Sequence, residues 1–408
     1  MKAKIFNTLA VLTIIFSAHS LCSAKTTGVL ILDPTNATVA DPLTELNAHI
    51  IKSAGGTFML IEATTKHLHL KAKDIESLNS NAPATENAVT DPTDKSQEQD
   101  AQNIADDNAD QKIKNYSKSY AAAANSRLDI DNRYGKVSIK TWAKNEFKVD
   151  VQIKVLADKT DDAASLLNSI NITDKKQGQT VFFKTIIDKE ASIGVGKNNF
   201  RKVEINYVVY MPAKNALSVT NKLGDISLPD LSGKVVINCS FGDLVAKSLS
   251  NPANIIKVSY GDARITSLRA SDLDITSGTL TLGWADKLNA AMSYSSAKIG
   301  KISTSGVINV KYGSGVQIAD IDKNLKNLSV NSNYSAVKLG IADNENADFD
   351  VTTHYGSFNT GTKPVNISKK SAEDQRWNPT QNFKGHVGKG DVERMINIVS
   401  NYSVVKFE

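Results

Sequence analysis

Cysteine is nearly absent from this sequence. Only two cysteines occur among 408 residues, Cys22 and Cys239, and Cys22 lies in an N-terminal segment that we expect to be removed. The single thiol left in the mature chain cannot form an internal disulfide. We therefore expect the fold to depend on packing alone.

A large charge of one sign is also missing. The formal net charge is +5, with lysines and acidic residues interspersed, so the sequence lacks the dense basic surface that binds nucleic acid. It has no glycine-rich phosphate loop, nucleophile elbow, zincin helix or CxxC pair. Hydrophobic residues make up 41% of the chain, enough for a packed core. These features predict a protein that is not an enzyme and takes no cofactor.

Only one long apolar run is present, at the N-terminus. The run "IFNTLAVLTIIF" follows Lys2 and Lys4 and precedes the small and polar "SAHSLCSA", which are the parts of a secretory signal. We predict a signal peptide at residues 1–24 and no transmembrane segment, because the run is too short to span a bilayer. The large Leu21 disfavours a lipid anchor at Cys22. The mature protein is expected in the periplasm, at the outer membrane or on the cell surface.

Composition divides the mature chain into four regions. Residues 25–71 form a small segment of uncertain fold, in which Asp41-Pro42 and Gly55-Gly56 are typical of a helix start and stop. Residues 72–113 are polar and too poor in large apolar side chains to order themselves, so we predict a disordered linker. Residues 114–215 alternate apolar and polar side chains as half-buried strands do, with one helix expected at "DDAASLLNSI". Residues 216–408 contain repeats, with an insertion at about 362–394.

The repeats share a short phrase with a small residue at its centre. "INCSFGDLVAKSL" is followed by "IKVSYGDARITSL", and the small residue recurs every 17 to 22 residues from position 224 to position 356. It is glycine at Gly135, Gly224, Gly242, Gly261, Gly278, Gly313 and Gly356, and serine at Ser295, Ser335 and Ser403. An aromatic residue precedes it at Tyr134, Phe241, Tyr260, Tyr294, Tyr312, Tyr334, Tyr355 and Tyr402.

The parity of apolar residues changes at this small residue. Ile256, Val258 and Tyr260 lie two apart before Gly261, whereas Ala263 and Ile265 lie two apart after it with the parity shifted by one. The pattern predicts two short strands joined by a corner, at which glycine would supply a positive φ. A unit of this size must stack on copies of itself, so we predict an all-β fold, a β-solenoid of 17–22-residue coils. Equivalent side chains would form ladders, with Cys239 buried beside Val258.

Aspartate follows the glycine in three successive copies, at Asp225, Asp243 and Asp262. Stacked carboxylates could hold calcium or form an acid pair that cleaves a polysaccharide. Aspartate beside glycine is also a common turn residue that faces solvent, and this is the interpretation we favour, so no metal site is predicted. His67 and His69 alternate in "KHLHLK" without a third ligand nearby. Trp377 and Phe383 lie in the insertion, where they would either bind a partner or fold back over the repeats.

Several blocks resemble a known family. "DNRYGKVSIKTW", "INYVVYMP", "NKLGDISLPDLSGKV" and "SYGDARI", then "NFKGHVGKG" and "SNYSVVKF", are similar in order to secreted bacterial domains called putative adhesins, β-solenoid domains of unknown function. The resemblance covers residues 114–408 and implies adhesion without catalysis.

These observations predict a non-enzymatic, exported interaction protein of the bacterial cell envelope, with an unknown protein or glycan as its partner. The alternatives are a polysaccharide-active β-helix enzyme and an envelope sensor that binds a regulatory partner. The sequence does not determine the oligomeric state.

Overall fold

The computed structural model describes residues 46–53, 56–63, 110–188, 194–196, 199–370 and 379–408. These fall into two compact units, Met1–Asp94 and Lys95–Glu408, which are treated separately below. No helix in these ranges is long and apolar enough to cross a membrane.

The first unit contains an antiparallel hairpin of β1 (Leu46–Ser53) and β2 (Gly56–Ala63). The helix predicted here is therefore wrong. Two β-branched residues, Ile50 and Ile51, lie in β1, and the apolar stretch after the glycine pair supplies a second strand of equal length. A glycine pair can end a helix, but it also suits the turn between two strands. His67 and His69 lie outside the described residues.

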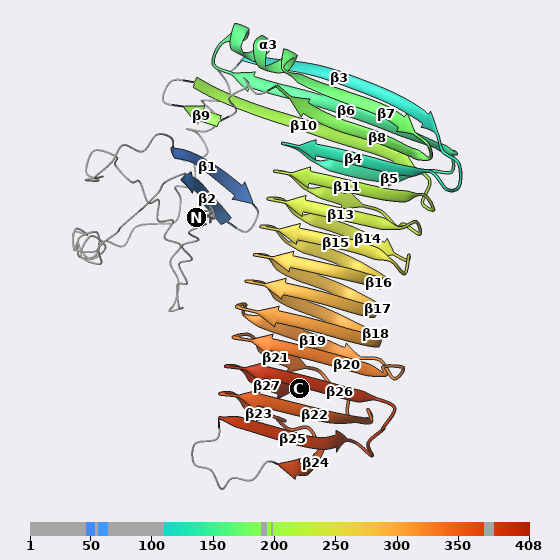
Figure 1. Ribbon diagram of the computed structural model, residues 1–408, viewed down its shortest axis with the longest axis vertical. Helices are drawn as coiled ribbons and strands as arrows, with labels where there is room; N and C mark the ends of the chain where they lie inside the picture. The colour runs from blue at the N-terminus through green and yellow to red at the C-terminus, as the bar shows by residue number, and fades with distance from the viewer. Residues whose placement is uncertain (1–45, 54–55, 64–109, 189–193, 197–198, 371–378) are drawn as a thin grey trace, which may run out of the picture. The chain divides into compact units, whose positions relative to one another are not determined.

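The second unit is all-β apart from one described helix, as predicted (Figure 1). At its N-terminal end, β3 (Asp110–Ala121) and β10 (Asn199–Met211) flank β6 (Glu146–Ala157) in an antiparallel arrangement. The alternating apolar residues of β6, from Phe147 to Val155, are buried. β3 takes in residues 110–113, which the sequence assigned to the linker.

The remaining elements of this end complete a cap over the first repeat. They are the predicted helix α3 (Thr160–Asn168), the hairpin of β7 (Ile170–Gln177) and β8 (Thr180–Ile187), and the short β9 (Gly194–Gly196). β8 pairs in parallel with β4 (Arg127–Arg133), and β10 pairs in parallel with β5 (Val137–Thr141). The cap therefore supplies partners to both strands of the first repeat, which would otherwise be an open sheet edge.

Each repeat consists of two strands that meet at the small residue, and we call it a repeat unit. The strands of the first four repeat units are β4 and β5; β11 (Ala216–Lys222) and β12 (Ile226–Leu228); β13 (Val235–Ser240) and β14 (Leu244–Leu249); and β15 (Asn254–Ser259) with the first part of β16 (Ala263–Thr276). The others involve β17 (Thr279–Ser293), β18 (Ser296–Lys311), β19 (Gly315–Ile321), β20 (Asn327–Asn333) and β21 (Ala336–Leu339). The long strands β16, β17 and β18 each end one unit and begin the next.

Both strands of a repeat unit pair in parallel with the equivalent strands of its neighbours. β13 pairs with β15, and β14 pairs with the first part of β16, so that Cys239 lies opposite Val258. Val258 in turn lies opposite Ile275. Cys239, Val258 and Ile275 are all fully buried, so equivalent side chains stack through the core of the second unit. Figure 1 shows the strands of successive repeat units side by side.

The last repeat unit in the sequence is not the last in the stack. β26 (Met395–Asn401) lies between β20 and β22 (Ala347–His354) and pairs in parallel with both. β27 (Val404–Phe407) likewise lies between β21 and β23 (Ser357–Asn359). The unit with its corner at Ser403 is therefore inserted between the units of Ser335 and Gly356 (Figure 1).

The insertion predicted before this unit closes the C-terminal end. β25 (Thr380–Val387) pairs antiparallel with β22 and with β24 (Val365–Lys370). Phe383 of β25 is buried and lies 5.3 Å from Phe358, ring centroid to ring centroid. Of the two alternatives for this aromatic residue, packing against the repeats is the one observed. Trp377 lies outside the described residues.

Arg394 holds the inserted unit in place. Its side chain is almost fully buried, and its guanidinium donates hydrogen bonds to the carbonyl oxygens of Leu325, Asn346 and Asp322 at 3.3, 2.6 and 2.9 Å. It also pairs with Glu345 at 2.6 Å. One side chain thus links the loops before β20, β22 and β26.

We expect Arg394→Met to destabilise the second unit by about 3 kcal/mol, because it removes the ion-pair partner of Glu345 and the hydrogen bonds to three carbonyl groups. Denaturant melts measure the change. Lys406→Met is the control, since it breaks an exposed ion pair with Glu408 and should cost less than about 1 kcal/mol. Equal losses would contradict this role of Arg394.

Candidate functional site: the corner rows of the repeat units

The backbone turns at the residue before the small one. Positive φ values between 51° and 63° occur at Tyr134, Leu223, Phe241, Tyr260, Ser277, Tyr294, Tyr312, Tyr334, Tyr355 and Tyr402. Among the described residues, none of the corner glycines has a positive φ. The prediction that glycine supplies the left-handed conformation is therefore wrong. The aromatic residue adopts it, which is unusual for a residue with a side chain.

Glycine is needed at the corner because there is no space for a side chain. A Cβ atom added to Gly261 would lie 2.1 Å from the carbonyl oxygen of Gly242, and one added to Gly242 would lie 2.2 Å from that of Gly224. At Gly135 the same contact, at 2.2 Å, is to Ile205 of β10. Successive corners therefore touch through their backbones.

The serine corners use their hydroxyl groups in this contact. The Ser295 Oγ accepts a hydrogen bond from the Gly278 N–H at 3.2 Å, and the Ser335 Oγ accepts one from the Gly313 N–H at 2.9 Å. Both serines are buried. A serine corner thus adds a side-chain hydrogen bond to the preceding repeat unit.

The left-handed conformation turns the aromatic side chain outward. Tyr260 is 43% exposed, whereas Val258, two residues earlier, is fully buried. The prediction that both face the core is wrong for Tyr260, because the change of φ reverses the side-chain direction at that residue. The tyrosines of the later units are half exposed or more.

Equivalent aromatic rings stack on one another along the corners. Phe241 and Tyr260 lie 4.8 Å apart with an interplanar angle of 3°. A longer column runs through Tyr294, Tyr312, Tyr334, Tyr402 and Tyr355, with centroid separations of 5.4, 5.6, 4.7 and 4.9 Å in that order. Leu223 and Ser277 interrupt the series. We call the five-membered part the tyrosine column.

The three aspartates form hydrogen bonds between repeat units. The Asp225 Oδ1 accepts from the Asp243 N–H at 3.1 Å, the Asp243 Oδ1 from the Asp262 N–H at 2.9 Å, and the Asp262 Oδ1 from the Thr279 N–H at 2.9 Å. Arg264 lies between two of the carboxylates, 3.1 Å from Asp243 and 2.9 Å from Asp262. Its charge and these N–H groups offset the repulsion that stacked carboxylates would otherwise have.

The aspartates of this row are engaged in hydrogen bonds within the protein. In the parts of the chain that the structure describes, no group of three or more His, Cys, Asp and Glu side chains could hold a metal ion. Each aspartate instead accepts a hydrogen bond from the next unit, as in a turn.

We expect Asp243→Asn to change stability by less than about 1 kcal/mol, because the amide oxygen can still accept the Asp262 N–H and only a partly exposed ion pair is lost. Thermal melts of the parent and the variant, each with calcium and with a chelator, test this. A melting temperature that falls with chelator in the parent alone would require a metal at this row.

Cys239 is buried in the core, where it lies opposite Val258. Burial raises the pKa of its thiol to about 12, and the carboxylates of Asp225 and Asp243 add to the effect. Its Sγ lies 3.3 Å from the Gly242 carbonyl oxygen. A thiol that is neutral and inaccessible is not a nucleophile.

We therefore expect no reaction of native Cys239 with a disulfide reagent at pH 8, and one equivalent of reaction in denaturant. The unfolded thiol ionises near its ordinary pKa of 9.0, below that of the folded state, so this group's contribution to stability is lost as the pH rises above 9. Full reaction of the native protein within minutes would contradict burial of the thiol.

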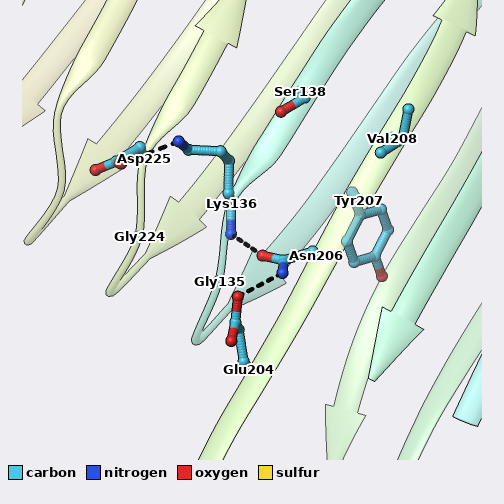
Figure 2. A pocket seen from close by; sticks show the side chains of 9 residues that line it. All are labelled: Gly135, Lys136, Ser138, Glu204, Asn206, Tyr207, Val208, Gly224 and Asp225. Atoms are coloured by element: carbon cyan, nitrogen blue, oxygen red, sulfur yellow. Dashed lines mark hydrogen bonds and ion pairs between the residues drawn. The ribbon is translucent and has the colours of Figure 1, made fainter. Parts of the chain in front are cut away.

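Two hollows lie near the N-terminal cap, and acidic side chains that line them have partners within the protein. The first, of about 380 Å³, is lined by Lys136, Glu204, Asn206 and Asp225 among others (Figure 2). Asn206 accepts from the Lys136 N–H at 2.9 Å and donates to Glu204 at 2.6 Å, while the Lys136 Nζ lies 3.6 Å from Asp225 (Figure 2).

The second hollow, of about 400 Å³, lies over β4, β7 and β8. It contains Asp131, paired with Lys184 at 2.9 Å, and Asp174, which accepts hydrogen bonds from the hydroxyls of Tyr116 and Tyr120. Burial opposes ionisation of Asp174, but the two phenols lower its pKa. The lowered pKa of Asp174 is the opposite of the raised pKa that a general acid needs.

No family model matches this sequence, and no curated protein is similar to it. Solved structures are similar. One is a putative cell adhesion protein from Clostridium sporogenes, at 10% identity over 72% of this chain and 99% of that one, with a TM-score of 0.16. Putative adhesins from Parabacteroides distasonis and Bacteroides fragilis are 12% and 13% identical, each over 72% of this chain and 97% of theirs, with TM-scores of 0.34 and 0.29.

The chain resembles putative adhesins of known structure. This agrees with the resemblance found in the sequence. A further neighbour from Parabacteroides distasonis is described as a putative lipid binding protein, at 10% identity over 72% of this chain and 96% of that one, with a TM-score of 0.25. At these levels of similarity no residue and no activity is transferred to this chain.

Sequence reasoning missed a second row of small residues. Gly283, Gly300 and Gly340 lie one strand further on, and an added Cβ would meet a backbone oxygen of the neighbouring unit at 2.5, 2.3 and 2.0 Å. Their constant distance of five residues after Gly278, Ser295 and Ser335 is a signal that could have revealed this second row of close backbone contacts.

Proposed function

We propose that residues 110–408 form a β-solenoid and that the mature protein is a non-enzymatic, exported interaction protein of the cell envelope, adhesive or structural in role. The parallel, in-register pairing of both strands of successive repeat units supports the solenoid. Residues 25–71 would form a separate small segment, joined through a linker that ends before β3.

The observation that carries the interaction role is the tyrosine column. Soluble proteins rarely expose a continuous aromatic surface, and such surfaces indicate binding sites. Here the exposure is systematic, because the positive φ at each of the five corners of the column directs the ring to solvent.

The charged side chains of the second unit support a binding role rather than a catalytic one. The acidic side chains of the corner row and of the two hollows accept hydrogen bonds or pair with cations within the protein. A polysaccharide-cleaving site needs one carboxylic acid with a raised pKa beside a second carboxylate.

Binding to envelope fractions tests the proposal. Labelled mature protein, residues 25–408, should sediment with isolated cell envelopes in a saturable manner. Incubation with soluble polysaccharides should release no reducing ends and no unsaturated products. Absence of envelope binding would contradict the interaction role, and product release would favour the enzyme alternative.

A further inference from the structure

The tyrosine column presents a regular series of polar groups on an apolar strip. Its five rings are between 50% and 63% exposed, and they continue across the inserted repeat unit because Tyr402 lies between Tyr334 and Tyr355. Within the described part of the chain, none of the five phenol hydroxyls has a hydrogen-bond partner. Each hydroxyl is therefore free to donate to and accept from a ligand.

The column is rigid before any ligand binds. The backbone N–H of Tyr294 donates to the Lys311 carbonyl oxygen at 2.9 Å, that of Tyr334 to Asn401 at 3.0 Å, and that of Tyr402 to His354 at 2.8 Å. Contact between neighbouring rings further limits their rotation. A ligand would therefore bind without the entropic cost of ordering a flexible surface.

Neutral side chains border the column on its upstream side. The two outward rows of β18, β20, β26 and β22 consist of Lys311, Asn333, Asn401 and His354, and of Asn309, Asn331, Val399 and Thr352. Lys311 and His354 are the only two of these eight residues with an ionisable side chain. Asn331 donates to Asn309 at 3.1 Å, so the amides themselves form a row.

The downstream side is also neutral next to the column. The first residues after the corners are Ser296, Ser314, Ala336, Val404 and Ser357. A basic row follows only further out, at Lys298, Lys338 and Lys406. The corner aspartates and Arg264 belong to earlier repeat units.

We propose that the tyrosine column and its bordering amides bind an uncharged polysaccharide that lies along the stack. Tyrosine and asparagine together supply rigid amphipathic area and adaptable hydrogen bonds. Spacings of 4.7 to 5.6 Å between rings repeat the same contact in one direction, which suits a polymer of repeated hydroxylated units. Neither of the two hollows described above is lined by the column, whereas a protein partner usually places an anchor side chain in a pocket.

This inference rests on the proposed function, and one experiment separates the two. The test variant carries Tyr312→Asn, Tyr334→Asn and Tyr402→Asn, because asparagine tolerates the left-handed conformation. The control is Tyr260→Asn, at a corner with the same φ and a stacked ring but beside Asp262 and Arg264. Circular dichroism and thermal melts establish that both are folded.

Binding of the mature protein and both variants is measured on untreated, periodate-oxidised and protease-treated envelopes, and by native gel electrophoresis in dextran, laminarin, galactomannan and alginate. We expect at least one neutral polysaccharide to retard the parent and the control. The triple variant should bind both that polysaccharide and untreated envelopes at least 10-fold more weakly, and periodate should abolish envelope binding.

Three results would overturn the inference. Envelope binding that survives periodate but not protease would mean a protein partner and would leave the proposed function intact. Stronger retardation by alginate than by all neutral polysaccharides would mean that the basic row binds instead. Equal loss in the triple variant and the control would exclude a specific role for the column. Absence of envelope binding in the parent would instead contradict the proposed function itself.

Discussion

Gly261→Ala is expected to destabilise the second unit by at least about 3 kcal/mol. The added methyl group would lie 2.1 Å from the Gly242 carbonyl oxygen, and this oxygen belongs to backbone that is held by parallel strands on both sides. Relief of the contact would require two repeat units to separate, with loss of hydrogen bonds along both strands. Urea melts of residues 25–408 measure the change.

The control for this substitution is Gly178→Ala. Gly178 has a φ of +60°, and nothing lies within 4 Å of the position that a Cβ would occupy. Alanine there has only the cost of the left-handed conformation, about 1–2 kcal/mol. A loss at Gly261 no greater than at Gly178 would show that close backbone contact is not what selects glycine at the corner.

Val258→Asp should have the second large effect, a loss of more than about 4 kcal/mol. Val258 is fully buried between Cys239 and Ile275, where a carboxylate finds no partner. The pKa of the new side chain would be raised by burial, so the folded state would retain its proton above the pH at which the unfolded chain loses it. The destabilisation should therefore increase as the pH rises from 4 to 7.

Lys257→Asp on the same strand should change stability by no more than about 0.5 kcal/mol, because Lys257 faces solvent. Denaturant melts at both pH values compare the two variants. Similar losses from adjacent positions would be incompatible with an alternation of buried and exposed residues along β15.

The sequence was sufficient to predict the strands of the second unit and their alternation. The apolar positions of β6 and β15 repeat every two residues, and this period is a direct consequence of strand geometry. The helix α3 was also predictable, since its acidic first turn and apolar Leu166 and Leu167 are typical of a short amphipathic helix.

The conformation at the corner was not predictable from the same pattern. Both the aromatic residue and the glycine could occupy the left-handed position, and glycine is the common choice. The decision depends on the neighbouring repeat unit, whose backbone leaves no room for a Cβ at Gly261 but leaves open solvent for the ring of Tyr260. Non-local contacts of this kind are absent from a local motif.

The hairpin of β1 and β2 and the position of the inserted repeat unit were not predicted, for a related reason. Gly55-Gly56 is compatible with a helix end and with a turn, and only the pairing partner distinguishes them. The position of β26 between β20 and β22 depends on Arg394 and on a loop long enough to return to the stack. Neither is visible in the repeat phrase itself.

The inserted unit has a consequence for how the protein matures. During synthesis, β22 and β23 emerge before β26 and β27, yet they have no parallel neighbour until those later strands emerge. Folding by addition of successive repeat units therefore halts after the repeat unit of Ser335 until β26 and β27 have emerged. Through this interval the edges of β20 and β22 are unpaired and open to wrong partners, so a chaperone that shields them would act at this step.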